Sequence, residues 1–468
     1  MSDEVQFSAG KEDLAERLAR GRVASLSTEL SDVSEVEYRQ VRLERVVLAG
    51  LWTQGTQAEA DDAMAELADL ADTAGSQVVG RLVQRRDAPD PATYVGSGKV
   101  DEIKAIVEAA GADTVIADGE LSPAQLRNLE DRLGVRVVDR TMLILDIFAQ
   151  HARTNEGKTQ VELAQLNYLK QRLRGWGDSL SRQVGGRAAG GVGIGGRGPG
   201  ETKIETDRRR INTRVAILRR RLAGMATTRE LSRNTRRRDQ VPSVAIVGYT
   251  NAGKSSLLNK LTNADVLVED ALFATLDPTT RRVRAADGRV YTCTDTVGFV
   301  RHLPTDLVEA FKSTLEETAQ ADLLLHVVDG SGGDPLGQVA AVRAVLAQIG
   351  AGGAPELMVV NKVDAASGER LATLRHALPG AVFVSALTGE GIDGLRSTIE
   401  AGLPQPGRLV EVVVPWSRGD LIDKAHRTGE VVEMEATAEG TRLKARVRPG
   451  LAAELEAVDS DSPSHMMA

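Results

Sequence analysis

Residues 248–255 read GYTNAGKS, and these residue types at this spacing could hold a triphosphate. Gly248 and Gly253 let the backbone curl so that successive N–H groups face anionic oxygens. Lys254 can bring a positive charge to the β- and γ-phosphates, and the Ser255 hydroxyl is a suitable Mg²⁺ ligand. We therefore expect a phosphate site lined by this loop and the turn after it, namely Gly248, Asn251, Ala252, Gly253, Lys254, Ser255 and Ser256.

The flanking sequence supplies the context that a P-loop needs. The apolar run at 243–247 predicts a strand before the loop, and residues 256–261 predict a helix after it. The N-terminus of that helix would add partial positive charge beside the phosphates. The motif by itself leaves the base of the nucleotide open.

Three later segments indicate that the base is guanine, and the first of them faces the phosphates. Residues 291–298 read YTCTDTVG, a strand that ends in DxxG. Asp295 at the strand end would reach Mg²⁺ through water, and the Gly298 N–H can turn toward a γ-phosphate.

The other two segments would contact the base itself. After the apolar run 357–360 comes NKVD, in which Asp364 can accept hydrogen bonds from N1–H and N2–H₂ of guanine, a pair of donors that adenine lacks. Asn361 and Lys362 would brace this loop. The strand 382–384 then leads to three residues whose backbone N–H can meet the guanine O6: Ser385, Ala386 and Leu387. Four such elements in order, each at the end of an apolar strand, are typical of a GTPase.

Length and composition are those of a soluble protein with several domains. A chain of 468 residues predicts about three domains, and 42% hydrophobic and 26% charged residues are ordinary values. No apolar run reaches the roughly 18 residues of a membrane helix, and residues 1–4 lack a signal-peptide core. The one cysteine, Cys293, is read as a small buried core residue and fits a reducing compartment. We expect a cytoplasmic, monomeric protein that does not insert into membranes.

Positive charge is concentrated in one segment. Residues 151–238 carry 21 Lys/Arg and 7 Asp/Glu, a local balance of +14 in a chain of net charge −8, so the rest of the chain carries −22. An acidic protein with one basic element is typical of a chain that brings that element to nucleic acid. The alternative is a solvated basic helix surface.

The basic segment predicts two helices that bury a narrow apolar stripe against each other as an antiparallel hairpin. The stripes are formed by Leu163, Leu166, Leu169 and Leu173, and by Ile211, Val215, Leu218, Leu222 and Met225. Between them, nine of the residues 185–200 are glycine. An arginine-bearing tip on a two-helix arm suits contact with RNA phosphates and bases, whereas the alternative is a disordered linker. The residues expected to bind RNA are Arg187, Arg197, Arg208, Arg209 and Arg210.

The remaining segments predict an α/β multidomain fold with a Ras-like P-loop domain. Before the arm, strands are expected at 41–51, 77–84, 113–117 and 135–138, and helices at 57–73, 99–110, 122–133 and 141–152, which favours a mainly parallel sheet. Residues 94–99, YVGSGK, look phosphate-friendly but lack the P-loop spacing, so a turn and helix start is the better interpretation. After the P-loop domain, a strand at 408–415, a helix near 418–426 and strands at 428–436 and 441–447 predict a small α+β domain.

These elements divide the chain into six expected parts. They are a disordered N-terminus at 1–35, an α/β domain at 36–152, the arm at 153–239, the GTPase domain at 240–405, the α+β domain at 406–457 and a disordered tail at 458–468.

The chain resembles the HflX family of ribosome-associated GTPases, in the translation-factor class, over residues of about 38 to 457. The resemblance rests on the tip sequence GGRGPGET at 195–202, on ETDRR at 205–209 and on LFATLDP at 272–278, combined with the P-loop. It implies binding to the large ribosomal subunit and ribosomal RNA, and splitting of stalled or idle ribosomes into subunits. The alternatives are a GTP-gated assembly or hibernation factor that binds the large subunit without splitting, and an ATP-driven RNA remodeller, for which the N-terminal domain lacks a second P-loop.

The resemblance also places the switch residues. Thr275 falls where such GTPases carry the switch I threonine that meets Mg²⁺ and the γ-phosphate, although Thr279 and Thr280 are nearby competitors. Gly298 begins switch II, and the next residue, Phe299, stands where Ras-like enzymes use a glutamine to position water. Because phenylalanine cannot hydrogen-bond water, we expect slow intrinsic hydrolysis that ribosomes stimulate.

Asn251 resembles the P-loop asparagine with which a subset of GTPases binds K⁺ beside the phosphates. That subset tends to lack the catalytic glutamine, as this chain does. The alternative is that the Asn251 side chain only hydrogen-bonds its own loop. The expected cofactors are therefore Mg²⁺ and, with this resemblance, K⁺.

Overall fold

The computed structural model describes residues 45–185, 199–238, 241–262, 272–285, 288–301, 318–404, 408–447 and 449–460, together with Leu307 and Leu315. The chain forms two compact units. The described part of the first unit runs from 45 to 225 and includes 272–276, Arg301 and Leu307; the other described residues belong to the second unit.

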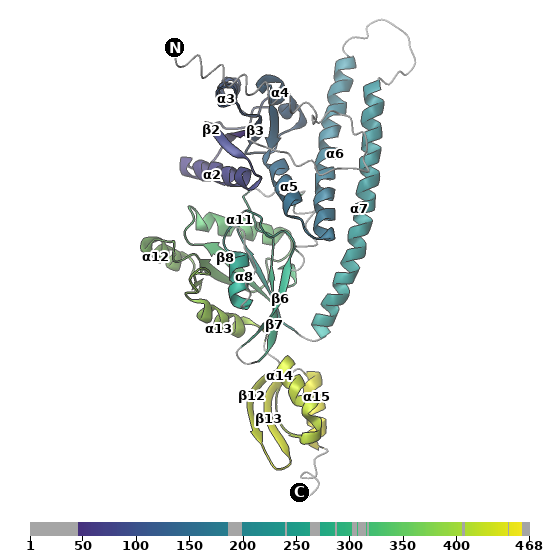
Figure 1. Cartoon of the computed structure of the whole chain (residues 1–468), viewed down its shortest axis with the longest axis vertical. Helices are drawn as coiled ribbons and strands as arrows, with labels where there is room; N and C mark the ends of the chain where they lie inside the picture. Colours follow the sequence, from purple (N-terminus) through teal and green to yellow (C-terminus); the bar gives the residue numbers. More distant parts are fainter. Residues whose placement is uncertain are drawn as a thin grey trace. The chain divides into compact units, whose positions relative to one another are not determined.

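The first unit begins with an α/β domain built on a parallel sheet of order β2-β1-β3-β4 (Figure 1). Helices α3 and α4 pack together on one face, and α2 and α5 pack together on the other. The strands are β1 (Arg45–Trp52), β2 (Gln77–Arg85), β3 (Thr114–Ala117) and β4 (Arg136–Asp139). The helices are α2 (Gln57–Thr73), α3 (Ser97–Ala110), α4 (Pro123–Leu133) and α5 (Arg140–His151).

Every helix and strand expected in this domain is confirmed, with ends shifted by a few residues. Local signals set the ends: Thr56 and Ser122 each form a capping box, and α4 stops at Gly134 in the left-handed conformation. The segment 94–99 is a turn and helix start, as expected, because α3 begins at Ser97. Residues 1–44, with the expected disordered N-terminus and the first part of the expected strand 41–51, lie outside the described residues.

The arm consists of α6 (Asn155–Gly185) and α7 (Pro199–Arg238), which run side by side (Figure 1). The expected seam is confirmed in part: Leu163 and Leu166 of α6 pack against the α7 residues Ile211, Val215, Leu218 and Leu222. Leu169 and Met225 are half-buried and are not in this cluster, and the side chain of Leu173 lies outside the described residues. An ion pair of 2.5 Å from Arg214 to Glu162 joins the helices beside the seam. The glycine-rich tip, with Arg187 and Arg197, lies outside the described residues.

A buried carboxylate attaches α6 to the α/β domain. Asp139, 1% exposed at the end of β4, accepts hydrogen bonds from the backbone N–H groups of Leu121 (3.3 Å) and Met142 (2.9 Å). It also accepts from Tyr168 Oη at 2.7 Å and from Arg172 Nη2 at 2.9 Å, both on α6. One side chain thus connects a strand, a loop and two helices.

The second unit contains a six-stranded sheet of order β10-β9-β8-β5-β7-β6. All neighbours are parallel except β6, which runs antiparallel to β7. The strands are β5 (Ser243–Gly248), β6 (Thr279–Arg284), β7 (Val290–Asp295), β8 (Leu323–Asp329), β9 (Glu356–Asn361) and β10 (Val382–Phe383). The helices between them are α8 (Lys254–Thr262), α11 (Pro335–Gln348), α12 (Gly368–Ala377) and α13 (Ile392–Gly402). Cys293 is fully buried in this core, as expected, and burial raises the pKa of its thiol.

The chain ends in a small α+β domain whose sheet has the order β11-β13-β12, with helices on one face (Figure 1). Its elements are β11 (Arg408–Pro415), α14 (Gly419–Thr428), β12 (Glu430–Ala436), β13 (Gly440–Val447) and α15 (Pro449–Ser460), with a 3₁₀ turn at Trp416–Arg418. The expectation of disorder from residue 458 is wrong for 458–460, because α15 buries Leu451, Ala452 and Leu455 in this core. Residues 461–468 lie outside the described residues.

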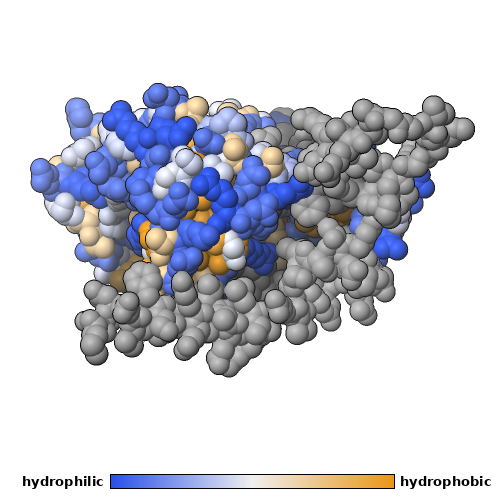
Figure 2. Space-filling model, turned by 90° about the horizontal axis from the view of Figure 1, so that it is seen from above, coloured by the Kyte–Doolittle hydropathy of each residue, from blue (hydrophilic) through white to orange (hydrophobic). Residues whose placement is uncertain are grey.

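The described surface gives no sign of a membrane segment. No helix among the residues that the structure describes is both long and apolar enough to span a bilayer. Figure 2 shows one face of the molecule, where hydrophilic residues dominate and apolar ones form small patches between them.

We predict that Asp139→Ala loosens the attachment of α6 and destabilises the first unit by about 3–5 kcal/mol, because the buried Tyr168 hydroxyl and Arg172 guanidinium lose their acceptor. Hydrogen exchange of α5 and α6 amides in the full chain measures this loss of protection. The exposed Asp131→Ala is the matched control, expected within about 0.5 kcal/mol of the wild type. Equal protection of α6 in both variants would contradict the role of Asp139.

Candidate nucleotide-binding site

The candidate site lies at the carboxyl edge of the second unit's parallel strands, where open α/β sheets bind ligands. The P-loop follows β5, and the neighbouring strands β7, β8 and β9 end in Asp295, Asp329 and Asn361. The sequence prediction of a strand before the loop and a helix after it is confirmed by β5 and α8. The residues expected at the phosphates therefore lie in one loop and the first turn of one helix, except Gly298, which follows β7.

The P-loop has the backbone that phosphate binding requires. Gly253 has φ +85°, and a Cβ there would lie 2.3 Å from Asn361 Nδ2, so only glycine fits. Lys254, 7% exposed, donates from Nζ to the carbonyl oxygen of Tyr249 at 2.8 Å, across its own loop. Burial lowers the pKa of the Lys254 amino group to about 8, against the opposing attraction of Asp295.

A hydroxyl and a carboxylate meet beside the loop. Ser255 Oγ donates to Asp295 Oδ2 at 2.6 Å, and Asp295 is 1% exposed. Hydroxyl and carboxylate oxygens are the ligands that Mg²⁺ prefers, and nucleotide sites complete its shell with phosphate oxygens and water. These two residues therefore fit a Mg²⁺ ion that binds together with a nucleotide.

The loops expected to hold the base are joined to the P-loop by one amide. Asn361 Nδ2 donates to the carbonyl oxygen of Ala252 at 2.9 Å, and its Oδ1 accepts from the N–H of Ala386 at 2.9 Å. The bracing role expected of Asn361 agrees with these bonds. Asp364, three residues further on, is exposed and has its carboxylate available for a base.

The structure narrows the choice of N–H groups for the guanine O6. The N–H of Ser385 donates to the carbonyl oxygen of Glu390 at 2.9 Å, and that of Ala386 is taken by Asn361. Leu387 is 79% exposed, and among the described residues its N–H has no protein acceptor. Of the three residues named from the sequence, Leu387 is the one whose N–H can still bind O6.

Asp329 belongs to this site but was missed in the sequence. Its Oδ2 forms an ion pair of 2.8 Å with Nζ of Lys362, and its Oδ1 accepts from the N–H and hydroxyl of Ser331. Lys362 has φ +61°, an uncommon conformation for a lysine, which the ion pair helps to hold. The available signal was the position of Asp329 directly after a buried strand, at the same edge as Asp295 and Asn361.

Phe299, at the expected start of switch II, is hydrogen-bonded to the P-loop through its backbone. The N–H of Phe299 donates to the carbonyl oxygen of Gly248 at 3.1 Å, and the N–H of Thr250 donates to the carbonyl oxygen of Phe299 at 2.7 Å. The Phe299 side chain is 1% exposed. Its apolar ring is therefore part of the core and does not face a water.

The segment expected to carry switch I, residues 272–276, belongs to the first unit. Phe273, 2% exposed, meets Phe148 edge to face with ring centroids 4.7 Å apart, and the N–H of Leu272 donates to Thr73 Oγ1 at 3.3 Å. Thr275 is half-buried in the same segment. Its contact with Mg²⁺ and the γ-phosphate stays a prediction.

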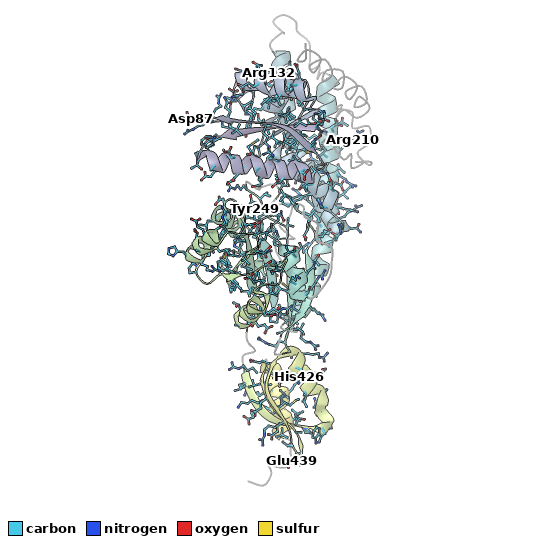
Figure 3. All side chains as sticks on the ribbon, turned by 60° about the vertical axis from the view of Figure 1, so that its left-hand side comes forward. Asp87, Arg132, Arg210, Tyr249, His426 and Glu439 are labelled. Atoms are coloured by element: carbon cyan, nitrogen blue, oxygen red, sulfur yellow. The ribbon has the colours of Figure 1, made fainter. Side chains whose placement is uncertain are left out.

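Three of the five residues expected to bind RNA lie among the described residues. Arg208, Arg209 and Arg210 are all exposed on α7, outside the apolar seam. Figure 3 labels Arg210 on this helix.

Three family models match most of the chain. They are described as GTP-binding GTPase N-terminal (residues 61–149), GTP-binding GTPase Middle Region (151–236) and 50S ribosome-binding GTPase (243–362). A GTPase HflX of Caldanaerobacter subterraneus subsp. tengcongensis is 45% identical over 408 residues, which are 86% of this chain and 91% of that protein. A GTPase HflX of Escherichia coli is 47% identical over 369 residues, 76% of this chain and 85% of that protein.

The chain belongs to the HflX family of GTPases. The family resemblance found in the sequence is thereby confirmed, as are the α/β multidomain fold and the P-loop GTPase domain. As an HflX GTPase the protein is an enzyme that binds and hydrolyses GTP.

We predict that Asp364→Asn weakens GDP binding by about 1–3 kcal/mol, because an amide N–H₂ would replace one acceptor oxygen facing the donors of guanine. Xanthine, which carries a carbonyl at position 2, should then bind better than guanine. Competition of GDP, XDP and ADP against a fluorescent nucleotide measures the change. The nearby exposed Glu369→Gln serves as the matched control, and equal affinity of the wild type for ATP and GTP would contradict the assignment.

We also predict that GDP affinity falls above pH 8. Phosphate favours the charged form of Lys254 and so raises its pKa above the value of about 8 set by burial. Binding is then at full strength below pH 8, takes up a proton above it and weakens by up to about tenfold per pH unit. Calorimetry at pH 7 and pH 9 in two buffers of different ionisation heat measures the uptake, with the exposed Lys260→Met as control. Equal proton uptake at both pH values would contradict the prediction.

Proposed function

We propose that this GTPase binds the large ribosomal subunit through its basic arm and splits stalled or idle ribosomes into subunits. The observation that carries the proposal is the exposed arginine group of α7, held on a long two-helix arm of the same chain as a GTPase domain. The matching family model for the GTPase domain is described as 50S ribosome-binding, which supports the same partner. We expect the protein to act in the cytoplasm as a monomer.

The arm is built to present charge rather than to bury it. Its seam uses only one narrow stripe of each helix, so the arginines of α7 outside the stripe face solvent: Arg208, Arg209, Arg210, Arg219, Arg220 and Arg221. Their clustering gives the field that attracts a polyanion, and guanidinium groups bind phosphate in a bidentate manner.

The GTPase domain would use its residues in distinct roles. Lys254 and the Gly298 N–H hold the γ-phosphate, Ser255, Asp295 and Thr275 hold Mg²⁺, and the guanine edge is held by Asp364 with Leu387. When bound, Mg²⁺ neutralises charge that builds up on the phosphate oxygens. Since Phe299 is buried and apolar, turnover should be slow without ribosomes and rise strongly with them.

Sedimentation tests the proposal against its alternative. Intact ribosomes are mixed with the protein and a non-hydrolysable GTP analogue, then resolved on a sucrose gradient, with phosphate release from GTP measured in parallel. Splitting predicts loss of the intact ribosome peak and protein on the large subunit. An assembly or hibernation factor would sediment with the large subunit and leave intact ribosomes whole. Unchanged GTP turnover in the presence of subunits would refute ribosomal activation.

We predict that changing Arg208, Arg209 and Arg210 together to Glu weakens subunit binding and flattens its salt dependence, because each lost phosphate contact removes about one unit of log–log slope. Filter binding at several salt concentrations measures both quantities. GDP affinity should stay within about twofold, since the arginines lie on a separate element. A matched control makes the same charge change at exposed residues outside the arm, Arg282, Arg427 and Arg442. The same loss in the control would mean that net charge, and not the arm, sets the affinity.

We further predict that K⁺ accelerates hydrolysis relative to Na⁺ and that Asn251 is required for this. Asn251 is exposed with φ +58°, and no hydrogen bond among the described residues ties its side chain to its own loop. Its carbonyl oxygen is therefore available as a hard ligand for K⁺, whose charge would act where other GTPases use an arginine. Asn251→Gly keeps the left-handed backbone and removes the oxygen, whereas Asn251→Asp keeps an oxygen. The test compares GTP turnover in K⁺ and in Na⁺ at equal ionic strength for the wild type and both variants. Equal turnover of the wild type in the two cations would contradict a K⁺ site at Asn251.

A further inference from the structure

The P-loop contains a buried hydroxyl, that of Thr250, that forms no hydrogen bond with the described residues. Thr250 is 6% exposed, and its Oγ1 is buried without a hydrogen-bond partner in the part of the chain that the structure describes. Leaving a buried hydroxyl unpaired costs about 1–3 kcal/mol, so such groups are rare and call for an explanation. In a loop that binds phosphate, an oxygen of the substrate is a partner that this hydroxyl would gain by turning about χ1.

Thr250 lies against the residue that begins switch II. Its N–H donates to the carbonyl oxygen of Phe299 at 2.7 Å, which holds the P-loop backbone beside the DxxG segment. A Cβ built on Gly298 would lie 2.7 Å from Thr250 Cγ2 and 3.1 Å from Lys254 Nζ. The side chain of Thr250, the backbone of Gly298 and the amino group of Lys254 thus converge on one small space. Tyr249, next to Thr250, is labelled in Figure 3.

That space is where the terminal phosphate of GTP belongs. In the proposed function, Lys254 and the N–H of Gly298 bind the γ-phosphate, and the inference rests on that assignment. The close approach also shows why position 298 is glycine: any side chain would press on Thr250 and Lys254. The methyl group of Thr250 is the side-chain atom that faces Gly298, so one change of the χ1 rotamer would bring the hydroxyl to that position, on the side of the proposed γ-phosphate site.

Phe299, the residue after Gly298, cannot position the water that attacks the γ-phosphate. The Phe299 ring is 1% exposed, and both its N–H and its carbonyl oxygen are engaged by the P-loop. Neither its side chain nor these backbone groups are left to orient a water. The group that does so must come from elsewhere, and the Thr250 hydroxyl lies in the P-loop itself without a partner among the described residues.

We propose that the Thr250 hydroxyl binds the attacking water during GTP hydrolysis and is a catalytic residue of this enzyme. The water oxygen forms a bond to the γ-phosphorus while the bond from that phosphorus to the β–γ bridging oxygen breaks. The electron pair of the broken bond stays on GDP, and the proton of the water passes to the inorganic phosphate. Thr250 Oγ1 accepts a hydrogen bond from the water and donates its own to a γ-phosphate oxygen, so it neither gains nor loses a proton overall.

The simplest alternative is that Thr250 only fills space between the P-loop and Gly298. Thr250→Val separates the two roles, because valine keeps the branched shape and removes the hydroxyl. Thr250→Ser keeps the hydroxyl and removes the methyl group that faces Gly298. If the role is packing, serine should be the more damaging change; if it is hydrogen bonding, valine should be.

The test is single-turnover GTP hydrolysis by the full chain without ribosomes, so that its outcome does not depend on the ribosomal proposal. We expect Thr250→Val to lower the rate constant by about 100-fold, the usual effect of deleting one hydrogen-bonding group aimed at a transition state. Thr250→Ser should stay within about tenfold of the wild type. GDP affinity should change by less than about threefold in both variants, whereas affinity for GDP with aluminium fluoride should fall in Thr250→Val by nearly the same factor as the rate.

Three results would overturn the proposal. The first is a wild-type rate in Thr250→Val. The second is a loss of GDP affinity in Thr250→Val as large as its loss of rate, which would show that the residue shapes the loop. The third is a greater loss of rate in Thr250→Ser than in Thr250→Val. A separate Lys254→Ala variant that still hydrolyses GTP at the wild-type rate would instead refute the proposed assignment of the phosphate site.

Discussion

The nucleotide site depends on the side chain of one asparagine at the end of a central strand. Asn361 is 2% exposed, and its amide joins the carbonyl oxygen of Ala252 in the P-loop to the N–H of Ala386 in the last loop of the site. A buried amide must satisfy both its donor and its acceptor, and here each goes to a different loop. The contact also forces glycine at position 253, which approaches Asn361 too closely for a Cβ. Phosphate and base regions are thereby fixed to each other before any ligand contact is considered.

Each helix of the arm uses one face to pack against the rest of the protein and leaves another face free for a partner. A narrow seam and the ion pair between Glu162 and Arg214 hold α6 and α7 together, and Asp139 attaches α6 to the α/β domain. Because these contacts use one side of α7, the other side can carry like charges that would destabilise a buried face. The repulsion among them is tolerated in solvent and is relieved when a polyanion binds.

Much of this organisation could be predicted from the sequence because the signals are local. Strand and helix patterns in the sequence predicted the elements of the first domain, and the P-loop, DxxG and NKxD motifs lie, as expected, at the ends of β5, β7 and β9. The missed features are of another kind. Asp329 and Asp139 matter through partners far away in the sequence, and such pairings carry no periodic pattern. The burial of the Thr250 hydroxyl likewise depends on the folded surroundings of the P-loop. Helix α15 was missed because its apolar positions are meaningful only beside the sheet that they cover.

The switch I segment shows most clearly why a local pattern is not enough. Residues 272–276 follow α8 and precede β6 in sequence, yet they pack within the first unit. Phe273 takes φ +57°, a left-handed conformation that costs a non-glycine residue about 1–3 kcal/mol. Burial of its ring against Phe148 offsets a cost of this size, since burying a phenylalanine side chain is worth about 1.5–3 kcal/mol. The position of Thr275, two residues away, is therefore set by packing in the first unit as well as by any ligand, and a motif for switch I names the residue without fixing where it lies.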